Sequence, residues 1–323
     1  MSEDYSPKTL PDLMKHLREN HSIQIKDEHT RQMLNYGYYH AYKGYRFFKK
    51  PSVIIPYTTF EQVLAVIDYD NDLKSALYPE MMFLETALKN IVVAYIIEDL
   101  PSAGIDMVMK KRMNDFPKDD ELKRKRNHMK NNIYSAVQSR SQNNAVIEHF
   151  KNKNVEIPIW AIFEVISLGD FISFLSCLNF RSRRHLLSKL KIQSDNDIEC
   201  QLLSNILILL KDLRNALAHN NVIFDTRFRD KEICENLVDW INIETGIENI
   251  DFNSITDYYI LIAVVLKKIE YEKEKLERFV KRMDVRYQTL KQKTSQQIFQ
   301  KLTTNLLDEK INGLKNYLKR PNK

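Results

Sequence analysis

The chain has 323 residues, of which 49 are basic, 43 are acidic and only 6 are glycine, so its formal net charge is +6. So few glycines argue against folds that need many tight turns. The sequence also lacks the GxGxxG and GxxxxGK(S/T) spacings of dinucleotide and P-loop sites. Its three cysteines, Cys177, Cys200 and Cys234, are too far apart in sequence to suggest a zinc site or a disulfide framework. We therefore predict no metal and no cofactor.

The apolar segments of the chain are interrupted by charges. Residues 1–11 have no apolar core of the kind found in signal peptides. The window 81–97 contains Glu85 and Lys89, and the similar window 159–178 also carries acidic residues. Such charges favour buried amphipathic helices over membrane spans. We expect a soluble cytoplasmic protein that does not bind membranes.

Apolar side chains that recur near every 3.6 residues predict helices along most of the chain, and therefore an all-α fold. Residues 59–100 predict one or two long core helices, and residues 198–213 predict another strongly apolar one. The charged run Lys267–Arg286 is expected to form a solvent-facing helix. We divide the chain into an N-terminal helical segment, a helical domain with a basic insertion near 101–156, and a basic helical C-terminal extension: 1–58, 59–250 and 251–323.

Residues 35–50 combine five tyrosines and two phenylalanines with five basic side chains. Aromatic faces stack on bases and nearby cations hold phosphates, so this composition predicts an RNA contact through Tyr39, Lys43 and Arg46. The alternative is that the tyrosines pack a small helical layer and keep their hydroxyls at its rim. The tyrosines that would form this layer are Tyr38, Tyr42 and Tyr45.

Two later regions are rich in basic residues. Lys110–Lys130 contains nine basic and four acidic residues, and the region from Lys267 to the end contains 16 basic and 7 acidic ones. Charge runs are usually solvated surfaces, but they can also hold phosphates. In the second interpretation the first region is an arm that contacts RNA through four adjacent cations: Lys123, Arg124, Lys125 and Arg126. Both interpretations stay open at this point.

The helix predicted at 198–213 is followed by candidate catalytic residues in the sequence Arg214-Asn215-Ala-Leu-Ala-His219. We call residues 214–219 the RNH motif. On an ideal helix Arg214 and His219 point about 140° apart. A site that uses both needs a distorted helix end, a wrapped arginine side chain, or a second copy of the helix in a symmetric dimer. The alternative is an ordinary helix C-terminus with His219 near the last carbonyls.

The chemistry that suits these side chains is RNA cleavage without a metal. A histidine that titrates near neutral pH can move a proton from the ribose 2′-hydroxyl or to the leaving 5′-oxygen. An arginine stays charged and offers planar donors to the phosphate. In this scheme Arg214 and His219 are catalytic, and Asn215 orients the imidazole or contacts the phosphate.

The RNH motif resembles the RxxxxH motif of HEPN-domain ribonucleases. Three more segments resemble, in the same order, those of Abi-like (AbiD/AbiF-type) abortive-infection proteins. These segments are Leu34–Phe47, Leu84–Asn90 and Pro158–Glu164 with the following Leu168–Asp170. Lys89 departs from the family pattern, in which arginine is expected. The region beyond about residue 250 carries no motif of this family.

Two glutamates are candidates for a supporting role at the site. Glu85 and Glu164 each lie in an apolar helix, where a buried carboxylate must find a partner or take a proton. We favour a structural partnership for Glu85, for instance with Lys89. We favour orientation of Arg214 or His219 for Glu164, because its segment resembles the family motif.

The resemblance implies an all-α HEPN-type helical bundle and a metal-independent endoribonuclease. It also implies a toxin in anti-phage defence that a small noncoding RNA restrains. The expected partners are thus RNA, as substrate and as inhibitor, and a second copy of the chain in a homodimer or higher assembly. Two alternatives remain: an RNA-binding protein without catalysis, and a helical scaffold for protein interactions.

Overall fold

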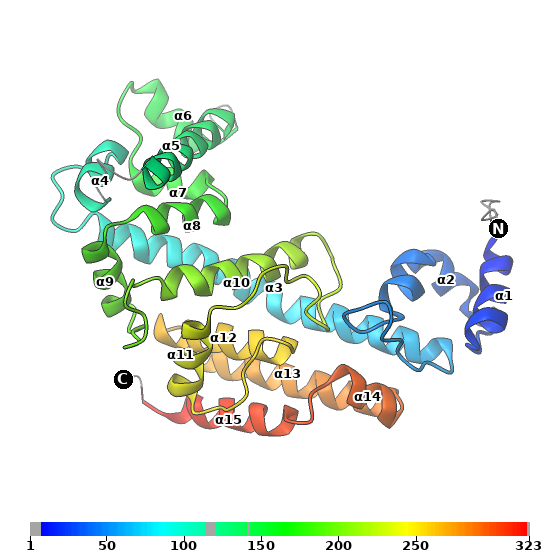
Figure 1. Cartoon of the computed structure of the whole chain (residues 1–323). Helices are drawn as coiled ribbons and strands as arrows, with labels where there is room; N and C mark the ends of the chain where they lie inside the picture. Colours follow the sequence, from blue (N-terminus) through cyan, green and yellow to red (C-terminus); the bar gives the residue numbers. More distant parts are fainter. Residues whose placement is uncertain (1–7, 114–119, 141–142, 322–323) are drawn as a thin grey trace.

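A computed structural model describes residues 8–113, 120–140 and 143–321, and helices dominate it (Figure 1). No strand occurs among these residues, whose extended pairings are isolated bridges such as Gln24 with Thr59. The predicted all-α fold is confirmed. The helices are α1 (Leu10–His21), η1 (Asp27–His29), α2 (Thr30–Tyr36), η2 (Tyr39–Lys43), α3 (Phe60–Ile96), α4 (Ile105–Arg112), α5 (Asp120–Arg140), α6 (Ala145–Asn152), α7 (Ile159–Val165), α8 (Leu168–Cys177), α9 (Phe180–Lys189), α10 (Leu202–Ala218), α11 (Glu235–Thr245), α12 (Ile255–Lys268), α13 (Lys273–Lys293), α14 (Gln296–Leu302) and α15 (Leu307–Lys319).

Helix α3 is the long axis of the molecule. It has 37 residues and therefore a length of about 55 Å. Its start is set by Thr59 and Gln62, whose side chains each accept a hydrogen bond from the other residue's backbone N–H. Pro79 lies inside the helix and is exposed, so water can bind the carbonyl that its missing N–H leaves free. Helices α10 and α13 both pack along α3.

The N-terminal helices lie at one end of α3 (Figure 1). Helix α1 is followed by α2 and by the π-helical turn η2, which packs on α3. Tyr38, Tyr42 and Tyr45 are all buried, which confirms that these three tyrosines pack a small helical layer. The expectation that their hydroxyls lie at its rim is wrong for Tyr45, because its hydroxyl donates to the fully buried Asp70. Tyr39 points outward and is 72% exposed.

The basic insertion is packed onto the bundle at the other end of α3 (Figure 1). Helix α5 lies against α7 and α8 and buries Met129, Ile133 and Val137. The Asn132 side chain donates to Asp170 of α8 at 3.3 Å. Part of the predicted arm, residues 114–119 with Lys118, lies outside the described residues.

The C-terminal helices share the core of the protein. Helix α12 is buried along nearly its whole length, and α13 packs against α3 through one face. Lys310 of α15 pairs with Asp257 of α12 at 2.7 Å, and both side chains are buried. The buried apolar side chains form one cluster that extends from Met14 to Tyr317.

The expected solvent-facing helix over Lys267–Arg286 is wrong. The chain turns after α12 through Glu270, whose φ is +59°, and α13 then buries Phe279 and Met283. Apolar residues recur at helical spacing within the charged run, and they form one face of α13 that packs on the core. Burial of this face decides the position of the helix, although most of its residues are polar. Within residues 8–113, 120–140 and 143–321, no helix has both the length and the apolarity needed to cross a membrane.

Candidate active site

The RNH motif closes helix α10. The helix ends at Ala218, and His219 follows as its cap, with its N–H bonded to the Asn215 carbonyl at 3.0 Å. Asn220 then takes a left-handed conformation with φ of +53°. Asparagine tolerates this conformation better than most residues, which explains why the helix stops here. The motif therefore lies at a helix C-terminus, as the alternative interpretation of the sequence expected.

A buried carboxylate holds the arginine of the motif. Glu85 of α3 is only 9% exposed and accepts a hydrogen bond from Arg214 Nε at 3.1 Å. Its other oxygen accepts from Lys89 Nζ, also at 3.1 Å. Lys89 donates in addition to the Ile166 carbonyl at 2.9 Å. One carboxylate therefore balances two cations, and the group keeps a net positive charge.

The bond through Nε leaves the outer edge of the guanidinium available. Arg214 Nη1 has only a long contact of 3.4 Å with the Asn215 side chain. Nη2 makes no hydrogen bond with the described residues, and the side chain is 32% exposed. Because the guanidinium is planar, clamping Nε fixes the direction in which the two terminal groups point. This arrangement suits a phosphate that approaches from solvent.

His219 lies apart from this group. Its side chain is exposed, and its imidazole forms no hydrogen bond or ion pair with any residue of the described chain. Nor do Arg214 and His219 contact each other, as the 140° separation predicts. The structure thus brings Arg214, Glu85, Lys89 and Asn215 together within one chain and leaves His219 outside.

Glu164 does not take the supporting position that we expected of it. Its side chain is exposed and forms no hydrogen bond or ion pair with the described residues. Helix α7 reaches the site through the backbone instead, because the carbonyl of Ile166 accepts from Lys89. The predicted pairing of Glu85 with Lys89 is confirmed, and Glu85 also has Arg214 as a partner. The prediction for Glu164 is wrong, because its side chain bonds to neither Arg214 nor His219.

A second buried acid fixes the segment after the motif, and sequence reasoning missed it. Asp70 of α3 is fully buried. Its Oδ1 accepts from the N–H groups of Ile223 and Phe224 at 2.9 and 2.8 Å. Its Oδ2 accepts from the Tyr45 hydroxyl at 2.8 Å. Asp70 therefore ties the segment after His219 to α3 and to residues 35–50, which we call the tyrosine-rich segment.

Lys74 extends this anchor toward the motif. Its ammonium pairs with Asp70 at 2.8 Å and donates to the Asn220 side chain at 3.0 Å. Asn220 is the residue directly after His219, so the position of the histidine backbone depends on Lys74. The signal in the sequence is an acid and a lysine four residues apart in a predicted core helix, next to two further aspartates, Asp68 and Asp72.

The model of a family described as Abi-like protein matches residues 31–225. This range includes the tyrosine-rich segment, α3 and the RNH motif, and it covers more than half of the chain. The chain belongs to the Abi-like family. No curated protein and no solved structure matches the chain. Membership suggests a role in abortive infection, and α11 to α15 of this Abi-like protein lie beyond the matched range.

The predicted RNA contacts of the Abi-like protein lie at the two ends of α3 (Figure 1). At the N-terminal end, Lys43 Nζ lies 5.2 Å from the centre of the Tyr39 ring, and Arg46 is half-buried nearby. At the other end, three of the four cations of α5 are exposed and Arg126 is half-buried. The exposed ones are Lys123, Arg124 and Lys125. The RNH motif lies between these two regions.

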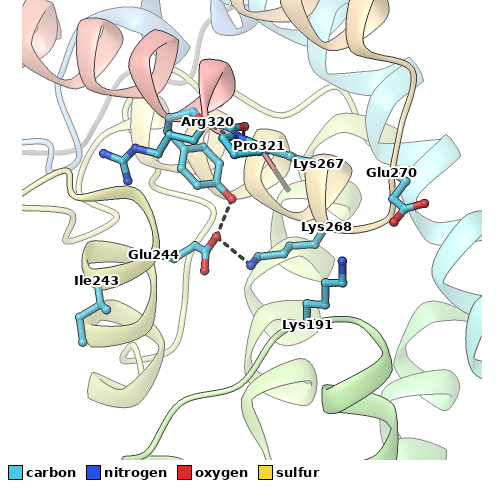
Figure 2. Close-up of a pocket in the computed structure, with 9 residues that line it drawn as sticks. Lys191, Ile243, Glu244, Lys267, Lys268, Glu270, Arg320 and Pro321 are labelled. Carbon is cyan, nitrogen blue, oxygen red and sulfur yellow. Dashed lines mark hydrogen bonds and ion pairs between the residues drawn. The ribbon is translucent and has the colours of Figure 1, made fainter. Parts of the chain in front are cut away.

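A cavity of about 240 Å³ lies far from the motif, between α11, α12 and α15 (Figure 2). Its central carboxylate, Glu244, accepts from the Tyr317 hydroxyl and from Lys268 Nζ, both at 2.8 Å. Lys267 Nζ donates to the carbonyls of Tyr317 and Arg320. These polar groups satisfy one another, and their bonds join three helices around the cavity.

One group of side chains outside the motif has the spacing of metal ligands. In the part of the chain that the structure describes, Glu28, His29 and Glu61 offer ligand atoms within 4.8 Å of one another. The ammonium of Lys26 pairs with both carboxylates, and His29 Nδ1 accepts from the Lys26 N–H. A lysine therefore supplies the positive charge that a metal would bring.

Proposed function

We propose that this Abi-like protein is a metal-independent endoribonuclease of the HEPN type and acts as a toxin in abortive infection. One observation carries the proposal. At the end of α10 an arginine is clamped by a buried carboxylate through Nε, and its terminal groups have only the long contact with Asn215 and remain partly exposed. Five residues later an exposed histidine makes no hydrogen bond or ion pair with the described residues. These are the side chains that phosphate binding and proton transfer at neutral pH require.

In the proposed reaction the 2′-oxygen of a ribose attacks the adjacent phosphorus. His219 takes the 2′-hydroxyl proton as the O2′–P bond forms, and the bond from phosphorus to the 5′-oxygen breaks. A proton from an imidazolium neutralises the leaving 5′-oxygen. The products are a 2′,3′-cyclic phosphate and a 5′-hydroxyl. Arg214 stabilises the charge that builds on the phosphoryl oxygens.

The active unit in this proposal is a dimer. Arg214 and His219 of one chain point in different directions, so an arginine and a histidine can converge on one phosphate if two copies of α10 meet. Both side chains are accessible on the same end of the helix, as such an arrangement requires.

We further propose that a small noncoding RNA restrains the enzyme in the cytoplasm. A ribonuclease that acts on cellular RNA must be held inactive until infection. The exposed cations of α5 supply a surface for such an RNA outside the motif.

The test is cleavage of an end-labelled RNA by the purified protein with EDTA present. Arg214→Ala and His219→Ala should each abolish cleavage and growth toxicity while the protein stays helical. His185→Ala is the matched control, because His185 is an exposed histidine on α9 that pairs with Glu98. Cleavage by both motif variants would refute the site. RNA binding without cleavage by wild type would favour the non-catalytic alternative, and an absence of bound RNA would favour the scaffold.

A further inference from the structure

Helix α1 and the tyrosine-rich segment bring four basic side chains together at the N-terminal end of the molecule. These are His16 and His21 of α1, Lys43 of η2 and Arg46, and we call them the N-terminal basic cluster. The two imidazole rings lie 5.0 Å apart. His21 lies 4.9 Å from the Tyr42 ring, and Lys43 Nζ lies 5.7 Å from the Tyr38 ring.

The cluster has no acidic partner among the described residues. Neither Lys43 nor Arg46 forms an ion pair with a carboxylate there, and Glu19 of α1 and Asp27 of η1 pair with Lys15 and Arg18 instead. Burial lowers the pKa of His21, and the charges of His16, Arg46 and Lys43 lower it further. Basic groups that face each other without a counter-charge destabilise a fold. An arrangement of this kind is typical of a site that binds an anion.

Two buried polar atoms beside the cluster also lack partners. Tyr38 is 8% exposed, and its buried hydroxyl has no hydrogen-bond partner among residues 8–113, 120–140 and 143–321. The Nε of Arg46 is buried and unpaired in the same way. Buried donors are nearly always satisfied in folded proteins, so two orphaned donors at one place indicate a missing acceptor.

The surroundings of the cluster favour RNA over a free anion. Tyr39 offers a ring that is 72% exposed next to Lys43, which is the combination on which bases of single strands stack. The cluster also lies near the RNH motif. A Cβ built on Gly44 would lie 3.9 Å from Val222, three residues after His219. Lys43 is the neighbour of Gly44, and Val222 is three positions from His219. The Cα atoms of Lys43 and His219 are therefore within roughly 20 Å of each other in space.

We propose that the N-terminal basic cluster binds a backbone phosphate of single-stranded RNA, with an adjacent base stacked on Tyr39, and so guides the strand toward the RNH motif. The proposal rests on the proposed function in one respect, that RNA is the ligand. Arg46 and Tyr38 donate to the phosphate oxygens, and Arg46 and Lys43 supply the positive charge. The site is separate from the groups that would carry out the chemistry.

The experiment measures binding of a labelled single-stranded RNA of about 12 nucleotides by filter binding in a His219→Ala background, which prevents cleavage. Arg46→Gln and Tyr39→Ala should each weaken binding about tenfold. Arg46→Gln should also flatten the dependence of log affinity on log salt by about 0.7. Tyr38→Phe should weaken binding without changing that slope, because it removes a donor and no charge.

The matched control is Lys15→Gln. Lys15 precedes His16 on α1, but its side chain is 66% exposed and pairs with Glu19. It should change affinity less than twofold. Thermal melts without RNA give a second readout. Arg46→Gln should leave the melting temperature unchanged or raise it, because the cation it removes is unpaired. A purely structural arginine would lower it.

The outcomes separate this proposal from the proposed function. If the variants bind RNA as the control does while wild type cleaves it, the cluster proposal is overturned and the ribonuclease stands. If the variants lose affinity but wild type never cleaves, the cluster stands and the ribonuclease fails. If no form of the protein binds single-stranded RNA, both are overturned.

Discussion

The replacement Glu85→Gln keeps the shape of the side chain and removes the charge between Lys89 and Arg214. Breaking a fully buried ion pair costs about 3–5 kcal/mol. Glutamine retains one acceptor, and Arg214 is 32% exposed, so solvent screens part of the loss. We therefore expect the free energy of unfolding to fall by about 2 kcal/mol and the melting temperature by about 4 °C.

The same replacement should slow RNA cleavage more than this loss of stability explains. The carboxylate fixes the plane of the Arg214 guanidinium, and small misplacements of a catalytic group cost large factors in rate. We expect cleavage to slow at least about tenfold at temperatures where the variant is fully folded. Chemical denaturation gives the stability, and initial rates on a labelled RNA give the activity.

Glu164→Gln is the matched control, because it makes the same chemical change in the neighbouring family motif. Glu164 is exposed and unbonded within the described chain, so the free energy of unfolding should change by less than about 0.5 kcal/mol. Cleavage should stay at the wild-type rate. If Glu164→Gln slows cleavage more than Glu85→Gln does, the assignment of the supporting carboxylate is wrong.

Four further predictions address the rest of the molecule. Lys310→Met should lower the free energy of unfolding by about 3–5 kcal/mol, measured by denaturant titration, because it leaves Asp257 buried without its cation. Burial raises the pKa of Asp257 to about 6, so its contribution to stability should decline as pH rises from about 4 to about 6. The replacement Asp257→Asn should remove this pH dependence, and an unchanged profile would contradict it. Light scattering should show a dimer under conditions in which RNA is cut. An active monomer would refute a site that combines Arg214 and His219 from two copies of the chain. Replacing the exposed cations of α5 with glutamine should weaken RNA binding and flatten its salt dependence, whereas an unchanged slope would make α5 a merely solvated surface. The cations to replace are Lys123, Arg124 and Lys125.

Local patterns in the sequence determined the helical architecture and the end of α10. Apolar periodicity needs only neighbouring residues, so it predicted α3 and α10 directly. The helix end at His219 likewise follows from the asparagines after it, which tolerate a left-handed backbone. The packing of Tyr38, Tyr42 and Tyr45 was one of two alternatives that composition allowed, and burial decided between them.

The tertiary structure alone decided which acids serve the site. Glu85 and Glu164 look alike in sequence, since each is the one carboxylate of an apolar stretch, residues 81–97 and residues 159–166. Only Glu85 bonds to Arg214, because the packing of α10 on α3 brings together two residues that are 129 positions apart in sequence. Asp70 reaches Ile223 across 153 residues. No pattern among neighbouring residues carries this information. A buried carboxylate is satisfied by whichever donors the packing of distant helices brings to it.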